Sequence, residues 1–203
     1  GTSVVWVDAQ NEEVLREGLS GADVFVGSRF TAIMAAAAPH LKLVHAAGAG
    51  YDGIDLTALP TGAVCANTFH HENSIAEYVA ASLVALRRGL LRQDAAVRGG
   101  IWSSSVYDQA ITPPETLEGS IVTFLGFGHI GAAAWRLLRV FGAEGVAITR
   151  RGDVDSRAHQ LRWSSDMTRL HEALAESDVL VVSIPGGERT SGIIARTELE
   201  LLG

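Results

Sequence analysis

The sequence predicts an α/β protein with two parallel-sheet domains. Short apolar segments alternate with segments of helical periodicity along most of the chain, and this alternation is typical of parallel strands joined by crossover helices. The alternation is interrupted at residues 99–118, which contain Trp102 and Pro113-Pro114. We therefore expect the chain to cross there between a first domain, residues 1–95, and a second domain, residues 96–203.

The first series predicts four strands, at residues 4–7, 23–26, 41–45 and 63–66. Helical patterns at 14–19 and 31–38 lie between them, and a glycine-rich turn at 47–53 follows the third strand. A longer helix is expected from Ser74, because Ser74-Ile75-Ala76-Glu77 fits a capping box. Apolar residues recur behind it at helical spacing to about Arg92.

The second series begins after the crossing. Strands are expected at residues 121–125, 146–149 and 179–184, and helices at 130–141 and 168–176. We interpret Trp6, Trp135 and Trp163 as packing residues. The strand at 179–184 would leave a sheet edge uncovered.

Composition narrows the function classes. The net charge of -7 argues against a nucleic-acid-binding protein, which is usually basic. No apolar run reaches about 18 residues and no signal-peptide pattern opens the chain, so a soluble cytoplasmic protein without a membrane partner is expected. Cys65 is the only cysteine, which excludes an intrachain disulfide.

The first strand of the second series runs into the motif Gly126-Phe127-Gly128-His129-Ile130-Gly131, which fits G-x-G-x-x-G. The first glycine allows a tight turn, the second lets a pyrophosphate approach the backbone, and the third lets the helix pack closely on the strand. The phosphates would lie on free amides at the helix N-terminus. Because the motif follows a strand and opens a helix, it predicts a dinucleotide site; the alternative is a glycine turn without a nucleotide.

The end of the next strand bears on the choice of cofactor. An acidic residue there would bind the adenosine ribose of NAD, but Arg150-Arg151 occupy the position and Asp153 follows only after Gly152. A guanidinium suits a 2′-phosphate through charge-assisted bonds. We therefore expect NADP, with NAD possible; alternatively, both arginines are solvated loop charges.

At this point the sequence resembles the D-isomer-specific 2-hydroxyacid dehydrogenases over nearly its whole length. The resemblance is carried by "HAAGAGYDGID" (45–55), "NSIAEYVAASLVALRR" (73–88), "GSIVTFLGFGHIGAAAWRLLRVFGAE" (119–144) and "LAESDVLVVSIPGGERTSGII" (174–194). It implies a flavodoxin-like parallel substrate domain followed by a Rossmann dinucleotide-binding domain, here incomplete at its C-terminus. It also implies hydride transfer to or from a 2-keto acid by a cofactor held in the cleft.

The resemblance assigns further residues. The Gly48-Ala49-Gly50-Tyr51 turn is similar to the family's substrate loop, and glycine-turn amides suit a carboxylate; the alternative is an ordinary strand-to-helix turn. Ser74-Ile75 resembles the part that faces the nicotinamide, and Ser183-Ile184-Pro185 the strand end beside the adenosine. Thr190 matches the threonine that follows, with a role that can be purely structural.

The histidines leave alternatives open. His70-His71-Glu72 invites a metal site, but adjacent side chains in an extended segment point in opposite directions, which disfavours one ion taking both histidines. His70 is a candidate substrate contact, or a plain loop residue. His45 and His129 are equally open, with a structural role favoured.

The family's arginine, glutamate and histidine, which carry out its chemistry, follow the region of Thr190 to Ile194, so no catalytic residue is expected before Gly203. We expect an oxidoreductase that reduces a small 2-keto acid, similar to a glyoxylate or hydroxypyruvate reductase, and a homodimer formed through the helix from Ser74. The chain by itself is expected to be inactive. The alternatives are a non-catalytic dinucleotide-binding or regulatory protein, and a short-chain dehydrogenase, which is disfavoured because no tyrosine is followed by the lysine of Y-x-x-x-K.

Overall fold

The computed structural model describes residues 1–8 and 11–202. The chain divides into two compact units. The first contains residues 1–70 and 185–189, and the second contains 71–184 and 190–203. All sheet pairing in both units is parallel, as the alternation of strands and helices predicted.

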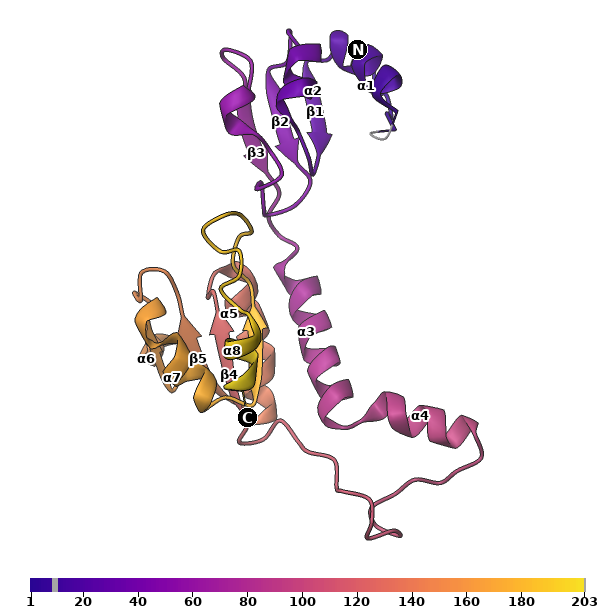
Figure 1. Ribbon diagram of the computed structural model, residues 1–203, viewed down its shortest axis with the longest axis vertical. Coiled ribbons are helices and arrows are strands. Elements are labelled where there is room, and N and C mark those ends of the chain that lie inside the picture. The colour runs from indigo at the N-terminus through magenta and orange to yellow at the C-terminus, as the bar shows by residue number, and fades with distance from the viewer. Residues whose placement is uncertain (9–10, 203) are drawn as a thin grey trace. The chain divides into compact units, whose positions relative to one another are not determined.

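The first unit is a three-stranded sheet in the order β1-β2-β3, whose strands lie side by side (Figure 1). The strands are β1 (Val24–Gly27), β2 (Leu43–Ala46) and β3 (Val64–Asn67), and the helices are α1 (Glu12–Ser20), α2 (Ala32–Ala37) and the short 3₁₀ helix η1 (Leu56–Ala58). Asn11 caps α1 and Thr31 caps α2 by accepting amide hydrogen bonds. Phe30 and Val44 are fully buried at the centre of this unit's core.

The expected strand at residues 4–7 is wrong. This segment has no secondary structure, Trp6 is 94% exposed, and the interpretation of Trp6 as a packing residue is therefore also wrong. A strand exists only where a neighbour satisfies its backbone groups, and no described segment pairs with this one. Only Val7 packs inward, against Gly18 of α1.

The second unit is a four-stranded sheet in the order β6-β5-β4-β7. Its strands are β4 (Ile121–Leu125), β5 (Glu144–Ile148), β6 (Trp163–Ser165) and β7 (Val179–Val182). Its helices are α3 (Glu72–Arg87), α4 (Leu90–Arg98), α5 (His129–Leu138), α6 (Ser156–His159), α7 (Leu170–Ala175) and α8 (Arg196–Glu200), with 3₁₀ turns η2 (Arg139–Phe141) and η3 (Met167–Arg169).

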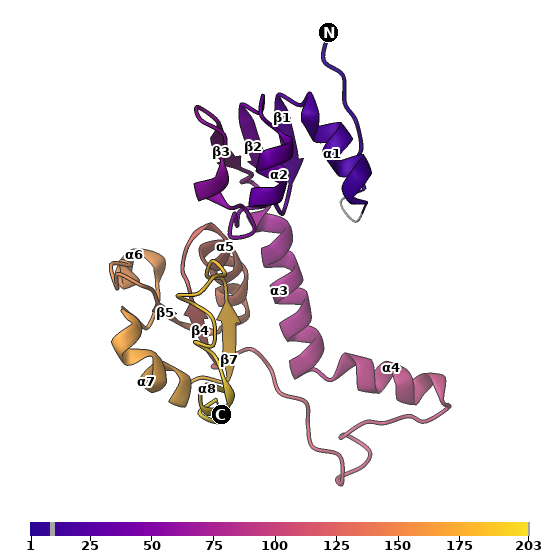
Figure 2. The ribbon, with the colours of Figure 1, turned by 45° about the horizontal axis from the view of Figure 1, so that its top comes forward.

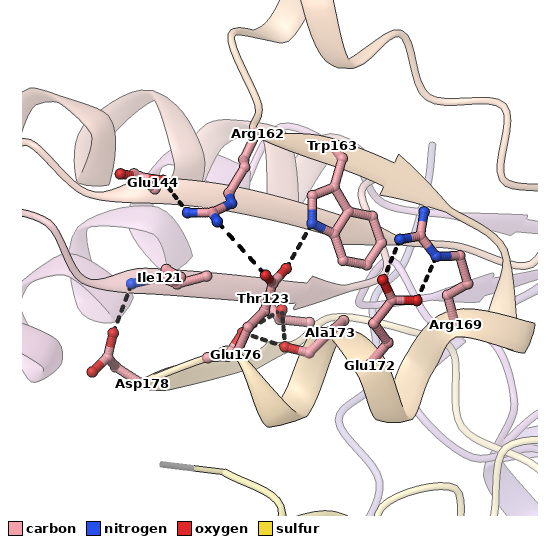
Figure 3. Close-up of polar contacts among 11 residues, drawn as sticks. Ile121, Thr123, Glu144, Arg162, Trp163, Arg169, Glu172, Ala173, Glu176 and Asp178 are labelled. Carbon is pink, nitrogen blue, oxygen red and sulfur yellow. Dashed lines mark hydrogen bonds and ion pairs between the residues drawn. The ribbon is translucent and has the colours of Figure 1, made fainter.

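Alternation along β4 sorts the core of this unit onto two faces. Val122 and Phe124 belong to the cluster that α3 and α5 complete, whereas Leu125 belongs to the cluster that α7 completes. The sheet is thus covered on both sides, which explains why four of the five β4 residues are buried. On the α7 side, the buried Thr123 hydroxyl is 2.7 Å from Ser177 Oγ, which donates to the Ala173 carbonyl (Figure 3).

The capping box predicted at Ser74 and Glu77 is wrong. The helix begins earlier, at Glu72, so Ser74 already lies in its first turn and donates from Oγ to the His71 carbonyl over 3.0 Å. The predicted end near Arg92 is also wrong. Gly89 adopts a left-handed conformation (φ 60°) that ends α3 and starts α4.

The connection between the two series is irregular and lies within the second unit. Residues 99–120 contain no helix or strand, as the interrupted alternation indicated. The boundary expected after residue 95 would fall within α4, whereas packing groups both α3 and α4 with the second unit. The reason is that Ala76 and Ala80 of α3 are buried in one cluster with residues of α5.

Candidate functional site

The glycine turn that follows β4 is built as its three glycines require. Gly126 has φ +91°, and its amide donates to the Ile148 carbonyl of β5 over 2.8 Å. A Cβ at this position would lie 2.7 Å from the Ser183 carbonyl oxygen, so no side chain fits. Ser183 Oγ donates to the Gly126 carbonyl over 2.9 Å, which ties the turn to the segment after β7.

The other two glycines of the motif differ from each other. A Cβ at Gly131 would lie 2.6 Å from the Gly126 carbonyl oxygen, so this glycine permits α5 to pack closely on the turn. No described atom lies within 4 Å of a Cβ placed at Gly128, which is the N-cap of α5. The backbone there can therefore be approached from outside, as a pyrophosphate requires, and the first turn with His129 and Ile130 presents the positive end of the helix dipole.

Phe127 anchors the turn from within. Its ring packs edge-on against Phe124 with a centroid distance of 5.6 Å and against His159 at 5.1 Å. His159 is held in turn by its carbonyl, which accepts a 2.7 Å hydrogen bond from the indole of the buried Trp135. Trp135 is thus confirmed as a packing residue.

The strand order places this turn where the order of the strands reverses. From β4 the chain builds β5 and β6 on one side, then returns to place β7 on the other side, beside β4 (Figure 2). Ligands of open α/β sheets bind where the order reverses, outside the carboxyl ends of the strands. The Gly126 turn and Ser183-Ile184 end these two neighbouring strands, and Ile184 Cγ2 lies 2.9 Å from where a Gly126 Cβ would be.

The two arginines that follow β5 differ in their ion pairing. Thr149 Oγ1 accepts from the Gly152 amide over 3.0 Å, which closes a turn around Arg150 and Arg151. Arg151 pairs with Asp153 over 2.7 Å, whereas Arg150 is exposed and contacts no charged partner among the described residues. Among the described residues no carboxylate occupies the strand end, and Arg150 is the arginine of this turn for which no ion pair is seen.

The turn after β2 in the first unit is also fixed by hydrogen bonds. The Gly48 carbonyl accepts from the Thr68 amide over 3.1 Å, and the Ala49 carbonyl accepts from Asn67 Nδ2 over 2.8 Å. Tyr51 is half exposed, and its carbonyl accepts from the Ile54 amide. Hydrogen bonds from Thr57 lower the pKa of Asp55, which keeps this carboxylate ionised as the cap of η1 directly after the turn.

His45 has a structural role, as the sequence favoured. Its Nε2 is 2.9 Å from Thr68 Oγ1, which donates to the Ala46 carbonyl over 3.2 Å. Because that donation uses the single hydroxyl hydrogen, Nε2 must carry a proton and donate to Thr68. His45 therefore supports the end of β3.

The remaining candidate residues lie in the sequence close to the points where the chain changes from one unit to the other. His70 has φ +72°, a left-handed conformation that is uncommon outside glycine, and His71 is the N-cap of α3. Ser74 is exposed and Ile75 half-buried in the first turn of α3.

Pro185 groups with the first unit and Thr190 with the second, and the Thr190 carbonyl accepts from the Ile193 amide. Within residues 1–8 and 11–202, no three His, Cys, Asp or Glu side chains gather as a metal site would require.

Sequence reasoning missed Asn67 and Thr68, which hold the turn after β2, and Thr149, which shapes the turn after β5. The available signal was their position, since polar residues at the carboxyl ends of parallel strands lie at one edge of a sheet. Across the described part of the chain, no helix is long and apolar enough to span a bilayer.

Comparison with protein families gives two matches that together cover the chain. The model described as "D-isomer specific 2-hydroxyacid dehydrogenase, catalytic domain" matches residues 1–92. The model of the same family's NAD binding domain matches residues 80–203.

Individual proteins agree with these matches. A D-3-phosphoglycerate dehydrogenase of Mycobacterium leprae (strain TN) is 30% identical over 201 residues, which cover 97% of this chain and 37% of that protein. A glyoxylate reductase of Thermococcus onnurineus (strain NA1) is 30% identical over 209 residues, which cover 98% of this chain and 61% of that protein. The chain thus spans less than two thirds of the length of these curated relatives.

Among solved structures, a Granulicella formate dehydrogenase superposes with a TM-score of 0.79 at 25% identity, covering 92% of this chain and 50% of that one. The chain therefore shares its fold with that formate dehydrogenase.

Proposed function

The chain belongs to the D-isomer specific 2-hydroxyacid dehydrogenase family, and from that premise we propose that it is the substrate- and cofactor-binding part of an oxidoreductase that reduces a small 2-keto acid with NADPH. The observation that carries the proposal is that the three glycines of the turn are under different steric constraints. Gly126 and Gly131 are required by packing, whereas Gly128 leaves the backbone open where a pyrophosphate would approach.

Each group of residues has a part in this proposal. The amides at the start of α5 hold the pyrophosphate, and Ile184 and Pro185 lie beside the adenosine. Ser74, Ile75 and Thr190 complete the cofactor surface. The amides of residues 48–51 hold the substrate carboxylate, with His70 as a further contact. When bound, the nicotinamide supplies the hydride. A glyoxylate or hydroxypyruvate reductase is the activity that we favour, and the sequence similarity to a glyoxylate reductase supports this choice.

The preference for NADPH rests on Arg150. An exposed guanidinium without a competing carboxylate can bind a 2′-phosphate, whereas the pairing of Arg151 with Asp153 makes Arg151 less available. A charge-assisted bond of about 1.5–3 kcal/mol corresponds to about 10–100-fold discrimination.

Calorimetric titration of the chain with NADPH and NADH tests both parts of the proposal. We expect Arg150→Ala to weaken NADPH binding by about 10-fold or more and to leave NADH unchanged. Arg151→Ala, on the same turn, is the matched control and should have a smaller effect. Equal loss for both cofactors would make the arginines plain loop charges, and no binding of either cofactor would refute the dinucleotide site. Cofactor binding by the full-length protein without glyoxylate turnover would favour a regulatory role.

We also propose a homodimer formed through the outer surface of α3 and α4. Tyr78, Leu86 and Leu91 are 73%, 70% and 76% exposed, and such a surface is more apolar than a solvated helix usually carries. Light scattering should give about twice the 21.4 kDa chain mass, and Leu91→Asp should return the monomer mass. A monomer before substitution would contradict this proposal.

A further inference from the structure

The substrate-side turn after β2 is held by two hydrogen bonds to adjacent carbonyls. The Thr68 amide binds the Gly48 carbonyl over 3.1 Å, and Asn67 Nδ2 binds the Ala49 carbonyl over 2.8 Å. Both donors come from the end of β3, which pairs with β2 in a register that places Asn67 opposite Ala46. Two consecutive peptide groups are therefore fixed from the same side.

Fixing a carbonyl also fixes the amide of the same peptide group. In a trans peptide, C=O and N–H point in opposite directions across a plane. The Gly48 carbonyl shares its peptide with the Ala49 amide, and the Ala49 carbonyl shares its peptide with the Gly50 amide. Both amides consequently point away from β3, and neither donates to a backbone carbonyl of the described residues. Two adjacent outward amides are the arrangement that binds an anion.

The two carbonyls are held by donors of different kinds. Thr68 uses its backbone amide, which any residue except proline would supply. Asn67 uses its side chain, and only a side chain with an N–H or O–H of the right reach can donate there. The Thr68 position is itself secured by His45 Nε2 at 2.9 Å from Thr68 Oγ1. The side chain of Asn67 is therefore the sequence-specific part of this support.

We propose that Asn67 is a positioning residue for substrate binding, which orients the Ala49 and Gly50 amides toward the substrate carboxylate without touching the substrate. This proposal rests on the proposed role of residues 48–51 in binding that carboxylate. Replacing the Asn67 amide by a carboxylate of the same shape would set two acceptors against each other, so the Ala49 peptide would rotate and the Gly50 amide would leave its place.

The test is a glyoxylate titration of the ¹⁵N-labelled chain, followed at the amide resonances of Ala49 and Gly50. In the unsubstituted chain both resonances should shift saturably. Asn67→Asp should bind glyoxylate about tenfold more weakly, the effect of losing roughly one aligned hydrogen bond. Asn67→Ala should also weaken glyoxylate binding. This variant replaces Asn67→Asp in the test if the spectrum of Asn67→Asp is not that of a folded protein.

Asn11→Ala is the matched control. Asn11 is an asparagine of the same unit whose side chain also binds backbone groups, the amides of Glu13 and Val14 at the start of α1. Its loss should lower stability and leave glyoxylate affinity unchanged, which separates a structural effect from a positioning effect.

The outcomes distinguish the positioning role of Asn67 from the carboxylate-binding role of the turn. Unchanged affinity in folded Asn67→Asp and Asn67→Ala would overturn the positioning role and leave the carboxylate role of the turn intact. An equal loss in Asn11→Ala would also overturn it, because the effect would then follow stability. No saturable shift at Ala49 and Gly50 in the unsubstituted chain would refute the carboxylate role of the turn, and the positioning role with it.

Discussion

Single atoms decide which glycines of the G-x-G-x-x-G motif serve the fold and which serve a ligand. At Gly131 a Cβ would meet the Gly126 carbonyl oxygen at 2.6 Å, and backbone cannot move aside as a flexible side chain can. At Gly128 the same methyl would meet no described atom, and φ is -85°, which any residue adopts. One motif thus contains positions under two different constraints.

Alanine substitutions should separate these constraints. Gly131→Ala should lower the free energy of unfolding by about 1–3 kcal/mol, because the methyl overpacks the turn. Gly128→Ala should change it by less than about 0.5 kcal/mol, as at an unconstrained surface site, yet weaken NADPH binding, because its methyl occupies the approach to the backbone. Urea unfolding and calorimetric titration measure the two quantities. Equal destabilisation by both substitutions would contradict the assignment.

At the scale of elements, Arg87 joins the end of α3 to the sheet. Its guanidinium is 2.7 Å from Glu115, 2.8 Å from Ser120 Oγ and 3.7 Å from Asp178, and its side chain is only 19% exposed. Asp178 in turn accepts from the Ile121 amide at the start of β4 over 2.8 Å (Figure 3). One side chain therefore connects α3, the loop before β4 and the start of β7.

Removing this connection should be costly. We expect Arg87→Ala to lower the free energy of unfolding by about 1.5–3 kcal/mol, since it leaves partly buried charge-assisted bonds unmade. Arg98→Ala is the matched control, because Arg98 pairs with Asp94 at the surface of α4 with its side chain 78% exposed. That change should cost no more than about 0.5 kcal/mol. Comparable losses in the two variants by urea unfolding would disprove the connection.

Elements with strong periodicity could be predicted from the sequence, whereas elements defined by distant partners could not. The residues of β4 could be predicted because a buried strand is a short continuous apolar run. Those of α5 could be predicted because apolar residues recur at helical spacing in an amphipathic helix. The segment 4–7 has the composition of a strand but no neighbour, and the local pattern at Ser74 carries no sign that the helix has already begun at Glu72. The bond from Asn67 to Ala49 spans 18 positions and depends on the pairing of β2 with β3.

The whole molecule consists of two compact units, each with its own core. Leu41 is 3% exposed in the core of the first unit, and Leu138 is fully buried in a core of the second. The chain links them at residues 70–71 and again around residues 185–189. Stability is therefore expected to belong to each unit separately.

Calorimetry should accordingly show two thermal transitions. Leu41→Ala and Leu138→Ala make the same chemical change in the two cores, and each should remove about 2–5 kcal/mol from its own unit. Each variant should lower the temperature of one transition and leave the other in place. A single transition that both substitutions shift equally would contradict independent stability.

The strand order β6-β5-β4-β7 has a consequence in time as well as in space. Only α5 and η2 separate β4 from β5, whereas β5, α6, β6, η3 and α7 also precede β7, and the bond from Ser183 to Gly126 spans 57 positions. Closing a longer loop loses more conformational entropy, and distant pairings slow folding. We expect β7 to join last during refolding, so pulse-labelled hydrogen exchange should show its amides protected after those of β5. Simultaneous protection would contradict this order. Until β7 joins, one edge of β4 stays open to pairing with another chain, which makes the refolding intermediate the state most prone to aggregate.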